Sequence, residues 1–404
     1  MSTQIQISSS GAATGIWGIS DASGVYTYYA TLTLAMAAAT AGQTIEMFAD
    51  VTETANVTVS LKHGVNINGN GHTYTFTNNS GTMFSCATSG PVLGTIIIEN
   101  LNIVRTNTAS TGASMFAFTG SGGYATTKLY FTGSYITYTV TSGNSPVITA
   151  GDPLNTLIVD GLFCITNGAG TTVTGGTTTN SYIECTGAST AFSSGTIRNS
   201  RITTTSGSGT VNSTAISCTI TCTTSGIGVN EGNAYDCYII TNTGNCMQAG
   251  SSIAQGGADS CTVSSTSGIC FRRVVPSNCV ASSGSNLVVD HWFNYGGTRF
   301  LRNYFATTST SPVFACSGGT MELVDSTIIQ NGTGPGIRVT GASNQDVINC
   351  TVIVASAAAN CLNATAASNS RYVNNKFKGA TTPVSANVTQ TVTNTIDNQG
   401  NILL

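Results

Sequence analysis

Residues 216–220 read Ile-Ser-Cys-Thr-Ile, residues 235–239 read Tyr-Asp-Cys-Tyr-Ile, and residues 348–352 read Ile-Asn-Cys-Thr-Val. The three stretches share one pattern: an apolar residue, then Asp, Asn or Ser as a marker, often Cys, any residue, and an apolar residue. The pattern recurs between residues 197 and 377 in steps of 18 to 25 residues. Self-similarity with a period of this size is typical of solenoid proteins.

Further copies differ in detail from these three. The copy at residues 197–202 reads Ile-Arg-Asn-Ser-Arg-Ile and carries one extra residue. In the copy at residues 301–305 we take Asn303 as the marker. The other copies lie at residues 259–263, 277–280, 324–328 and 373–377, with looser copies at residues 99–103, 133–136 and 160–163.

The segments around each marker have the composition of β-strands. Residues 95–98 read Thr-Ile-Ile-Ile and residues 157–159 read Leu-Ile-Val, and β-branched residues of this kind favour strands. Asn, Asp and Gly tolerate the left-handed backbone that a tight corner needs. Leucine-rich repeats have a similar period, but their Leu-x-x-Leu-x-Leu frame is missing. The repeat therefore predicts an all-β fold, a parallel β-helix in which each coil consists of short strands joined by turns.

The cysteines follow the same repeat. Five of the 13 cysteines come directly after a marker; they are Cys218, Cys237, Cys261, Cys279 and Cys350. Three more, Cys246, Cys270 and Cys361, recur about 9 to 11 residues after a marker cysteine. Equivalent positions of a solenoid stack about 4.8 Å apart, so we expect files of reduced, packed thiols inside the coils. Oxidation between neighbouring coils is the alternative, although vertical neighbours seldom have disulfide geometry.

The chain is expected to have three parts. Residues 1–50 form an N-terminal segment with a capping helix, residues 51–380 form the coils, and residues 381–404 close the last coil or join a neighbouring chain. Within residues 31–42, Leu32, Ala35, Met36 and Ala39 lie on one helical face, with Thr31 as N-cap and Gly42 as the C-terminal stop. Such a helix would cover the open end of the solenoid.

Composition excludes several classes of protein. Only 7% of the 404 residues are charged, against about 25% in an average globular protein. The 13 Lys and Arg against 16 Asp and Glu argue against a nucleic-acid partner. No window of about 18 apolar residues predicts a membrane span, and the N-terminus lacks the features of a signal peptide. The alternative is that a leader peptide preceded this N-terminus and has been cleaved off.

The run from residue 31 to residue 73 resembles the entrance of right-handed parallel β-helix proteins of the pectate-lyase-like superfamily. In those proteins a capping helix precedes a Gly-x-Thr-Ile strand and a Gly-Val-x-Ile-x-Gly-Asn-Gly strand and turn, as residues 42–45 and 64–71 do here. The resemblance implies a right-handed parallel β-helix. It leaves the activity open, because the superfamily contains lyases, hydrolases, epimerases, phage tail spikes and adhesins.

The catalytic motifs of that superfamily are not found in this chain. An Asp-Asp pair, an Arg-Ile-Lys motif and an acidic calcium cluster are missing, and Asp160, Asp236 and Asp325 lie at or beside repeat markers, where corner hydrogen bonding explains them. Whether the chain is an enzyme stays open, with a non-catalytic role favoured. Asp290 with His291 is the best acid–base pair that the sequence offers. No metal and no cofactor is expected.

Residues 271–305 depart from the rest of the chain because they are rich in arginine and aromatic residues. Aromatic faces suit sugar rings, and arginine suits an acidic sugar. We therefore predict glycan binding by Arg272, Arg273, Trp292, Tyr295, Arg299 and Tyr304. The alternatives are a wider coil whose aromatic side chains fill the core, or a contact between subunits.

The favoured function is that of a bacteriophage virion surface protein, of the tail-spike, fibre or head-fibre type, which binds host-surface glycans. It would assemble in the host cytoplasm, where thiols stay reduced. The resemblance implies a homo-oligomer, most simply a trimer, and the N-terminal region would contact other virion proteins. An extracellular or cell-surface location is the alternative. Two other functions remain open: a polysaccharide lyase or glycoside hydrolase, and a purely structural filament or decoration subunit.

Overall fold

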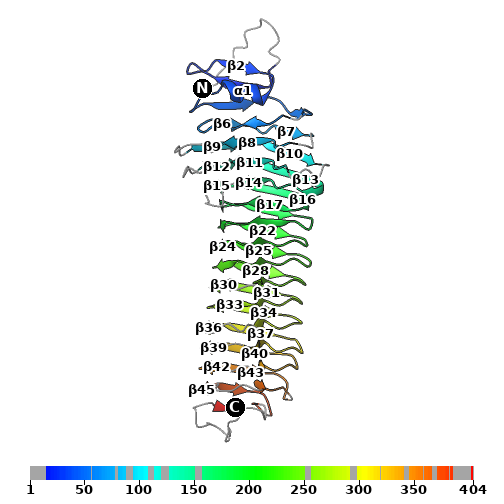
Figure 1. Cartoon of the computed structure of the whole chain (residues 1–404), viewed down its shortest axis with the longest axis vertical. Coiled ribbons are helices and arrows are strands. Elements are labelled where there is room, and N and C mark those ends of the chain that lie inside the picture. Colours follow the sequence, from blue (N-terminus) through cyan, green and yellow to red (C-terminus); the bar gives the residue numbers. More distant parts are fainter. Residues whose placement is uncertain are drawn as a thin grey trace, which may run out of the picture. The chain divides into compact units, whose positions relative to one another are not determined.

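The chain divides into two compact units, residues 1–164 and residues 165–404. The computed structural model describes residues 15–55, 57–77, 81–87, 94–107, 113–119, 127–150, 157–250, 256–291, 298–318, 320–340, 345–357, 359–365, 371–381, 383–384 and 402–403. In both units the chain winds through three sheets of parallel strands, here named A, B and C, and visits them in that order in every coil. The predicted fold, a right-handed parallel β-helix, is confirmed (Figure 1).

The first unit begins with a cap and continues as coils. The cap contains β1 (Trp17–Ser20), β2 (Tyr26–Tyr29), α1 (Leu32–Ala38) and β3 (Thr44–Met47). Sheet A of this unit holds β6 (Asn66–Asn68), β9 (Gly94–Glu99), β12 (Thr127–Thr132) and β15 (Leu157–Asp160). Sheet B holds β4 (Val51–Glu53), β7 (Thr73–Phe76), β10 (Asn102–Asn107) and β13 (Tyr135–Asn144). Sheet C holds β5 (Val59–Ser60), β8 (Phe84–Ala87), β11 (Phe116–Thr119) and β14 (Ile148–Ala150).

The second unit repeats the same coil many times. Sheet A holds β18 (Thr177–Thr179), β21 (Thr196–Arg198), β24 (Thr214–Ile216), β27 (Asn233–Tyr235), β30 (Gly256–Asp259), β33 (Val274–Ser277), β36 (Thr298–Leu301), β39 (Met321–Val324), β42 (Gln345–Ile348) and β45 (Tyr372–Val373). Sheet B holds β16 (Phe163–Ala169), in which the division between the units falls, β19 (Tyr182–Cys185), β22 (Arg201–Thr204), β25 (Thr219–Cys222), β28 (Tyr238–Thr241), β31 (Thr262–Ser265), β34 (Val280–Ser283), β37 (Tyr304–Thr307), β40 (Thr327–Gln330), β43 (Thr351–Val354), β46 (Lys376–Lys378) and β47 (Ile402–Leu403). Sheet C holds β17 (Thr171–Thr174), β20 (Thr190–Ser193), β23 (Thr210–Val211), β26 (Val229–Asn230), β29 (Met247–Gln248), β32 (Phe271–Arg272), β35 (Val289–His291), β38 (Phe314–Ser317), β41 (Ile337–Thr340) and β44 (Leu362–Thr365).

In the second unit a single residue in the left-handed region turns the chain from sheet A into sheet B. The marker residues occupy this position in the left-handed region, with φ of 47° at Asn199, 51° at Asp236 and 55° at Asn349. Asn and Asp adopt this conformation at low cost because their short polar side chains bond locally. The marker of the repeat is therefore a one-residue corner, as the sequence indicated.

Two details of the predicted repeat are wrong. The copy at residues 197–202 has no extra residue, because Arg198 and Ile216 are paired in register and both precede a corner. In the copy at residues 301–305 the corner is Arg302, with φ of 50°, and Asn303 takes the next position. The residue before each corner points outward and can be polar or apolar, so an apolar residue there does not fix the register.

The residue after each corner points into the coil and forms a buried file. In the second unit this file reads Ser181, Ser200, Cys218, Cys237, Cys261, Cys279, Asn303, Ser326, Cys350 and Asn375. The members donate to a carbonyl oxygen two residues earlier in the chain or in a neighbouring coil: Cys218 Sγ lies 3.2 Å from Ile216 O, and Asn375 Nδ2 lies 2.8 Å from Val347 O. The expected file of packed thiols is confirmed, and all 13 cysteines are buried and free of disulfides.

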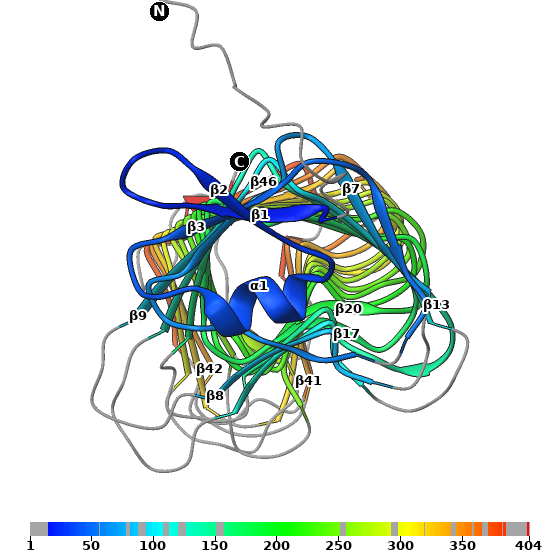
Figure 2. The ribbon, with the colours of Figure 1, turned by 90° about the horizontal axis from the view of Figure 1, so that it is seen from above.

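The capping helix is shorter than predicted. It spans Leu32–Ala38, with Thr31 as N-cap, and it buries Leu32, Ala35 and Met36. The helix ends before Gly42 because Ala39 is extended and the Lys62 ammonium donates to the carbonyl oxygens of Ala37 and Ala39. Helix α1 packs against β1, β2 and β5, and Figure 2 shows it lying across the end of the first coils.

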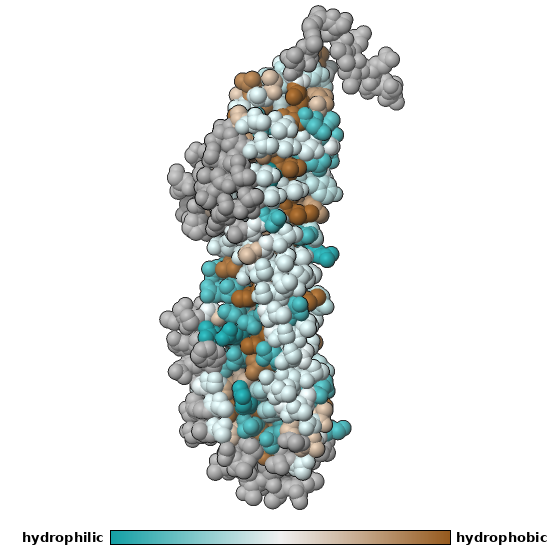
Figure 3. All heavy atoms as spheres, turned by 90° about the vertical axis from the view of Figure 1, so that its right-hand side faces the viewer, coloured by the Kyte–Doolittle hydropathy of each residue, from teal (hydrophilic) through white to brown (hydrophobic). Residues whose placement is uncertain are grey.

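The outer surface carries few charges. Most residues on the face in Figure 3 are white, which marks intermediate hydropathy, and teal and brown residues are scattered among them. The interior is filled by stacks of like side chains, such as Ile202, Ile220, Ile239 and Val263 on sheet B. Each coil therefore contributes one layer to a continuous apolar core, and small polar side chains cover the outside.

Candidate functional site

The predicted glycan-binding residues are distributed over all three faces of the second unit. Arg272 lies on sheet C, Arg299 on sheet A and Tyr304 on sheet B. One coil visits the three sheets in turn, so a segment as long as residues 271–305 cannot gather on one face. Trp292 and Tyr295 lie outside the described residues.

Sheet C brings part of the predicted set together. Strand pairing places Arg272 beside Asp290, Asp290 beside Ala315, and Ala315 beside Arg338, one coil after another. Alternate residues of a strand face the same side, so Arg272, Asp290 and Arg338 point outward while Phe271, Val289, Phe314 and Ile337 fill the core. Ala315 lies on the outward side as well, but only 5% of its surface is exposed. We refer to Arg272, Arg273, Asp290 and Arg338 as the arginine row.

The geometry of the arginine row centres on Asp290. Its Oδ2 lies 3.9 Å from Nε of Arg272, and the exposed fractions of the two side chains are 25% and 39%. Arg273 follows at the end of the strand, with φ of 61°. Partial burial raises the pKa of Asp290, while the positive charges of Arg272, Arg273 and Arg338 act against this rise. Asp290 is therefore a half-buried carboxylate with several guanidinium groups around it.

Positive charge predominates along this row. The charges of Arg272, Arg273 and Arg338 act on one carboxylate, that of Asp290. The nearest acidic side chain on the preceding coils is Glu231, whose carboxylate lies over Gly250. The small side chain of Ala315 separates Asp290 from Arg338, leaving about two coil spacings, or roughly 10 Å, between their backbones. An anionic group can pair with the exposed guanidinium group of Arg338, because guanidinium groups form paired hydrogen bonds with carboxylate, sulfate or phosphate oxygens.

His291 does not face the arginine row. It is the next residue of β35 and points inward, with 1% of its surface exposed and its ring centroid 5.2 Å from that of Phe300. Burial lowers the pKa of His291 to about 4. Asp290 and His291 thus point to opposite sides of one strand, and a ligand on the outer face of sheet C reaches only Asp290.

Several aromatic side chains of residues 271–305 belong to the core. Phe271, Phe300 and Phe305 are fully buried, and Phe300 stands edge-on to Phe314 with ring centroids 5.0 Å apart. The alternative of core-filling aromatics therefore holds for these three residues. Tyr304 differs, since 42% of its surface is exposed on sheet B.

Arg338 was not among the predicted glycan-binding residues, because it lies outside the arginine-rich segment of residues 271–305. Its signal was the repeat itself: residues 271–272, 289–290, 314–315 and 337–338 each pair a large apolar residue with an outward one. Arg299 lies apart from the row, in a groove on sheet A. Within the described ranges no cluster of His, Cys, Asp or Glu side chains could hold a metal ion. Among the same residues no helix is long and apolar enough to cross a membrane.

No family model and no curated protein matches this chain. Among solved structures, the chain is similar to a chain of the Vag8–C1 inhibitor complex, with 12% identity over 83% of this chain and 97% of that one and a TM-score of 0.50. It is also similar to the A-module of the Azotobacter vinelandii mannuronan C-5 epimerase AlgE6, with 12% identity, coverage of 85% and 92%, and a TM-score of 0.35. PfbA, a surface adhesin of Streptococcus pneumoniae, matches with 8% identity, coverage of 81% and 82%, and a TM-score of 0.22. These similarities concern the fold alone, and the neighbours are parallel β-helix proteins.

Proposed function

We propose that the chain is a surface protein that binds an acidic glycan through the arginine row on sheet C. The observation that carries the proposal is the set of guanidinium groups from Arg272, Arg273 and Arg338 around the half-buried Asp290. Uronate, sulfate or phosphate groups of a polysaccharide would pair with the guanidinium groups. Asp290 would hold the Arg272 side chain in place and accept hydrogen bonds from sugar hydroxyls.

A more specific proposal concerns the location of the chain and its role in attachment. A bacteriophage virion surface protein of the tail-spike, fibre or head-fibre type would use this site for attachment to host-surface polysaccharide, without cleaving it. The buried thiols suit assembly in the reducing host cytoplasm. A homotrimer on the virion surface, joined to other virion proteins through the N-terminal region, is part of the same proposal.

Binding of acidic sugars is the first test. Titration calorimetry with oligogalacturonate, and with sulfated oligosaccharides as a second acidic probe, should detect binding that weakens as salt rises. Arg272→Gln and Arg338→Gln should each weaken it about tenfold, since a charge-assisted hydrogen bond contributes roughly 1.5 to 3 kcal/mol. Arg198→Gln is the matched control, because Arg198 is an exposed arginine on sheet A. No binding of either probe at millimolar concentration, or equal loss in the control, would overturn the proposal.

Three further measurements test the more specific proposal. Sedimentation of the purified chain should give the mass of a trimer, and an antibody against it should label intact phage particles; a monomer or unlabelled particles would contradict it. Incubation with the acidic polymers should release no new chain ends. Release of reducing ends or unsaturated products would instead favour the lyase or hydrolase function.

A further inference from the structure

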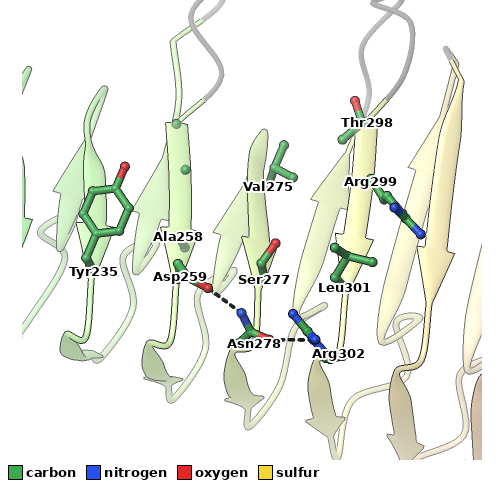
Figure 4. A pocket seen from close by; sticks show the side chains of 12 residues that line it. Tyr235, Ala258, Asp259, Val275, Ser277, Asn278, Thr298, Arg299, Leu301 and Arg302 are labelled. Atoms are coloured by element: carbon green, nitrogen blue, oxygen red, sulfur yellow. Dashed lines mark hydrogen bonds between the residues drawn. The ribbon is translucent and has the colours of Figure 1, made fainter.

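We propose that a groove on sheet A is a second carbohydrate site, separate from the arginine row, and that it takes an uncharged sugar chain. The groove is an open cavity of about 560 Å³ on the outer face of β27, β30, β33 and β36. This volume is within the range of sites for small ligands, about 300 to 1,000 Å³. Figure 4 shows the groove running across the strands, from one coil to the next.

Small residues make the floor of the groove between two bulkier ends. Tyr235, Asp259, Ser277 and Leu301 are paired in register on consecutive coils, so the row from Tyr235 to Leu301 covers about 14 Å. Gly257 places no side chain on the outer face of β30, and its N–H donates to Asn233 Oδ1 at 2.8 Å. A ligand can therefore lie along the stack between the Tyr235 ring and the Leu301 side chain.

The ends of the groove offer apolar contact. Tyr235 has 40% of its surface exposed, and Figure 4 shows its ring at one end of the groove. Val275 and Leu301 add aliphatic surface further along. An aromatic ring with a polar tip and neighbouring aliphatic groups suits a sugar, whose ring has apolar C–H faces and polar edges.

A line of polar side chains borders the same groove. Asn278 Nδ2 donates to Asp259 Oδ1 at 2.7 Å, and Arg302 Nε donates to Asn278 Oδ1 at 2.9 Å, as the dashed lines in Figure 4 show. These bonds engage one oxygen of Asp259 and one nitrogen of Arg302. The second carboxylate oxygen can accept, and the terminal guanidinium nitrogens can donate, so that both acceptors and donors are available to sugar hydroxyls.

Charge balance selects the class of ligand. Asp259 and Arg302 are joined through Asn278, and Arg299 forms an ion pair with Glu322 at 2.7 Å. Among these four charged residues, Asp259, Arg299, Arg302 and Glu322, the positive and negative charges are therefore equal in number, unlike those of the arginine row. A uronate would meet the Asp259 carboxylate without a surplus cation, whereas uncharged hydroxyls bond to both kinds of group. The groove thus favours an uncharged hexose chain.

The test uses the full chain and a panel of uncharged hexasaccharides made of glucose, mannose or galactose. At least one of them should bind in titration calorimetry, with little dependence on salt. Tyr235→Ala and Ser277→Tyr should each weaken that binding at least tenfold, the first by removing the ring and the second by filling the floor. Tyr238→Ala is the matched control, because Tyr238 lies three residues later on sheet B with 46% of its surface exposed.

The outcomes separate this proposal from the proposed function. Binding of oligogalacturonate should be unchanged in Tyr235→Ala and Ser277→Tyr, and binding of the uncharged chain should be unchanged in Arg272→Gln. Binding of no uncharged hexasaccharide at millimolar concentration would overturn the groove proposal, as would unchanged binding in both groove variants. If Ser277→Tyr instead dissociates an oligomer of the chain, the groove is a subunit contact and the proposal is wrong. Circular dichroism melting of both variants checks that they fold.

Discussion

Asn303 accepts a hydrogen bond at Oδ1 from the backbone N–H of Cys279, 3.0 Å away in the preceding coil. Its Nδ2 donates to the carbonyl oxygen of Pro276 at 3.1 Å. The same relation recurs where Ser200 accepts from the N–H of Ser181, and where Asn375 accepts from the N–H of Cys350. The file residue therefore satisfies buried backbone groups at the corner, which explains why only Ser, Cys and Asn occur at this position of the second unit.

Replacing Asn303 by leucine should destabilise the chain. Asn303 is 3% exposed, so Asn303→Leu leaves the N–H of Cys279 and the carbonyl of Pro276 buried without their partners. We expect a loss of about 2 to 4 kcal/mol in the free energy of unfolding, measured by urea denaturation. Asn303→Ser should cost less, because Ser326 fills the same position one coil later. Equal losses in the two variants would contradict this role.

The thiols of the file should be replaceable by hydroxyls but not by hydrocarbon. Cys237 Sγ donates to the carbonyl oxygen of Tyr235 at 3.2 Å, as Ser200 Oγ does to that of Arg198 at 2.6 Å. Cys237→Val removes this donor and should cost about 1 to 3 kcal/mol, and Cys237→Ser should cost about 1 kcal/mol less than Cys237→Val. Thermal unfolding of the two variants in a reducing buffer measures the difference. If valine is the better substitute, packing rather than hydrogen bonding explains the cysteines.

Burial of His291 should make stability depend on pH. Its pKa is about 4 in the folded chain and about 6.5 when unfolded, so between these values the unfolded chain binds the proton first. The free energy of unfolding should therefore fall by about 3 kcal/mol as the pH drops from 6.5 to 4, with no contribution above pH 6.5. Urea denaturation across this range, compared with His291→Leu, isolates the effect. If the free energies of unfolding of the two proteins differ by the same amount at every pH, His291 does not titrate in this way.

The pKa of Asp290 should depend on the charges of the arginine row. Arg272 is the first of the charges that hold down the raised pKa of Asp290. Arg272→Gln removes that charge, so the pKa of Asp290 should rise further, which NMR titration of the labelled carboxyl carbon can follow. Arg198→Gln, on sheet A, should leave the titration unchanged. An unchanged pKa of Asp290 in Arg272→Gln would show that the two side chains do not interact, and it would argue against the proposed binding site.

The stabilising effects of Arg105 and Tyr138 should depend on each other. The guanidinium carbon of Arg105 lies 5.4 Å from the ring centroid of Tyr138 and 5.5 Å from that of Phe76, and the side chain is fully buried. It also donates to the carbonyl oxygens of Ser114 and Gly81. A double-mutant cycle of Arg105→Met and Tyr138→Leu should give a coupling of about 0.5 to 2 kcal/mol. Additive losses would mean that the Tyr138 ring does not stabilise Arg105.

The repeat made the fold predictable because every coil carries the same local information. A corner residue that tolerates a positive φ, a small polar or thiol residue after it, and β-branched residues on both sides recur at each step, so the errors at Arg198 and Arg302 did not change the architecture. The candidate site was less predictable. Arg272 and Asp290 are far apart in sequence, and Arg338 is further still, yet strand pairing aligns them on one sheet.

The sequence by itself determined the coil, most of its corners, its capping helix and its files of cysteines, because these follow from local residue patterns that recur in every coil. Only the tertiary structure decided which residues share a face, since that depends on the exact length of every coil. It placed Arg299 in a charge-balanced groove, Tyr304 on another sheet and His291 in the core. Side chains adjacent in sequence, such as Asp290 and His291, point to opposite sides of one strand, whereas residues a whole coil apart become neighbours.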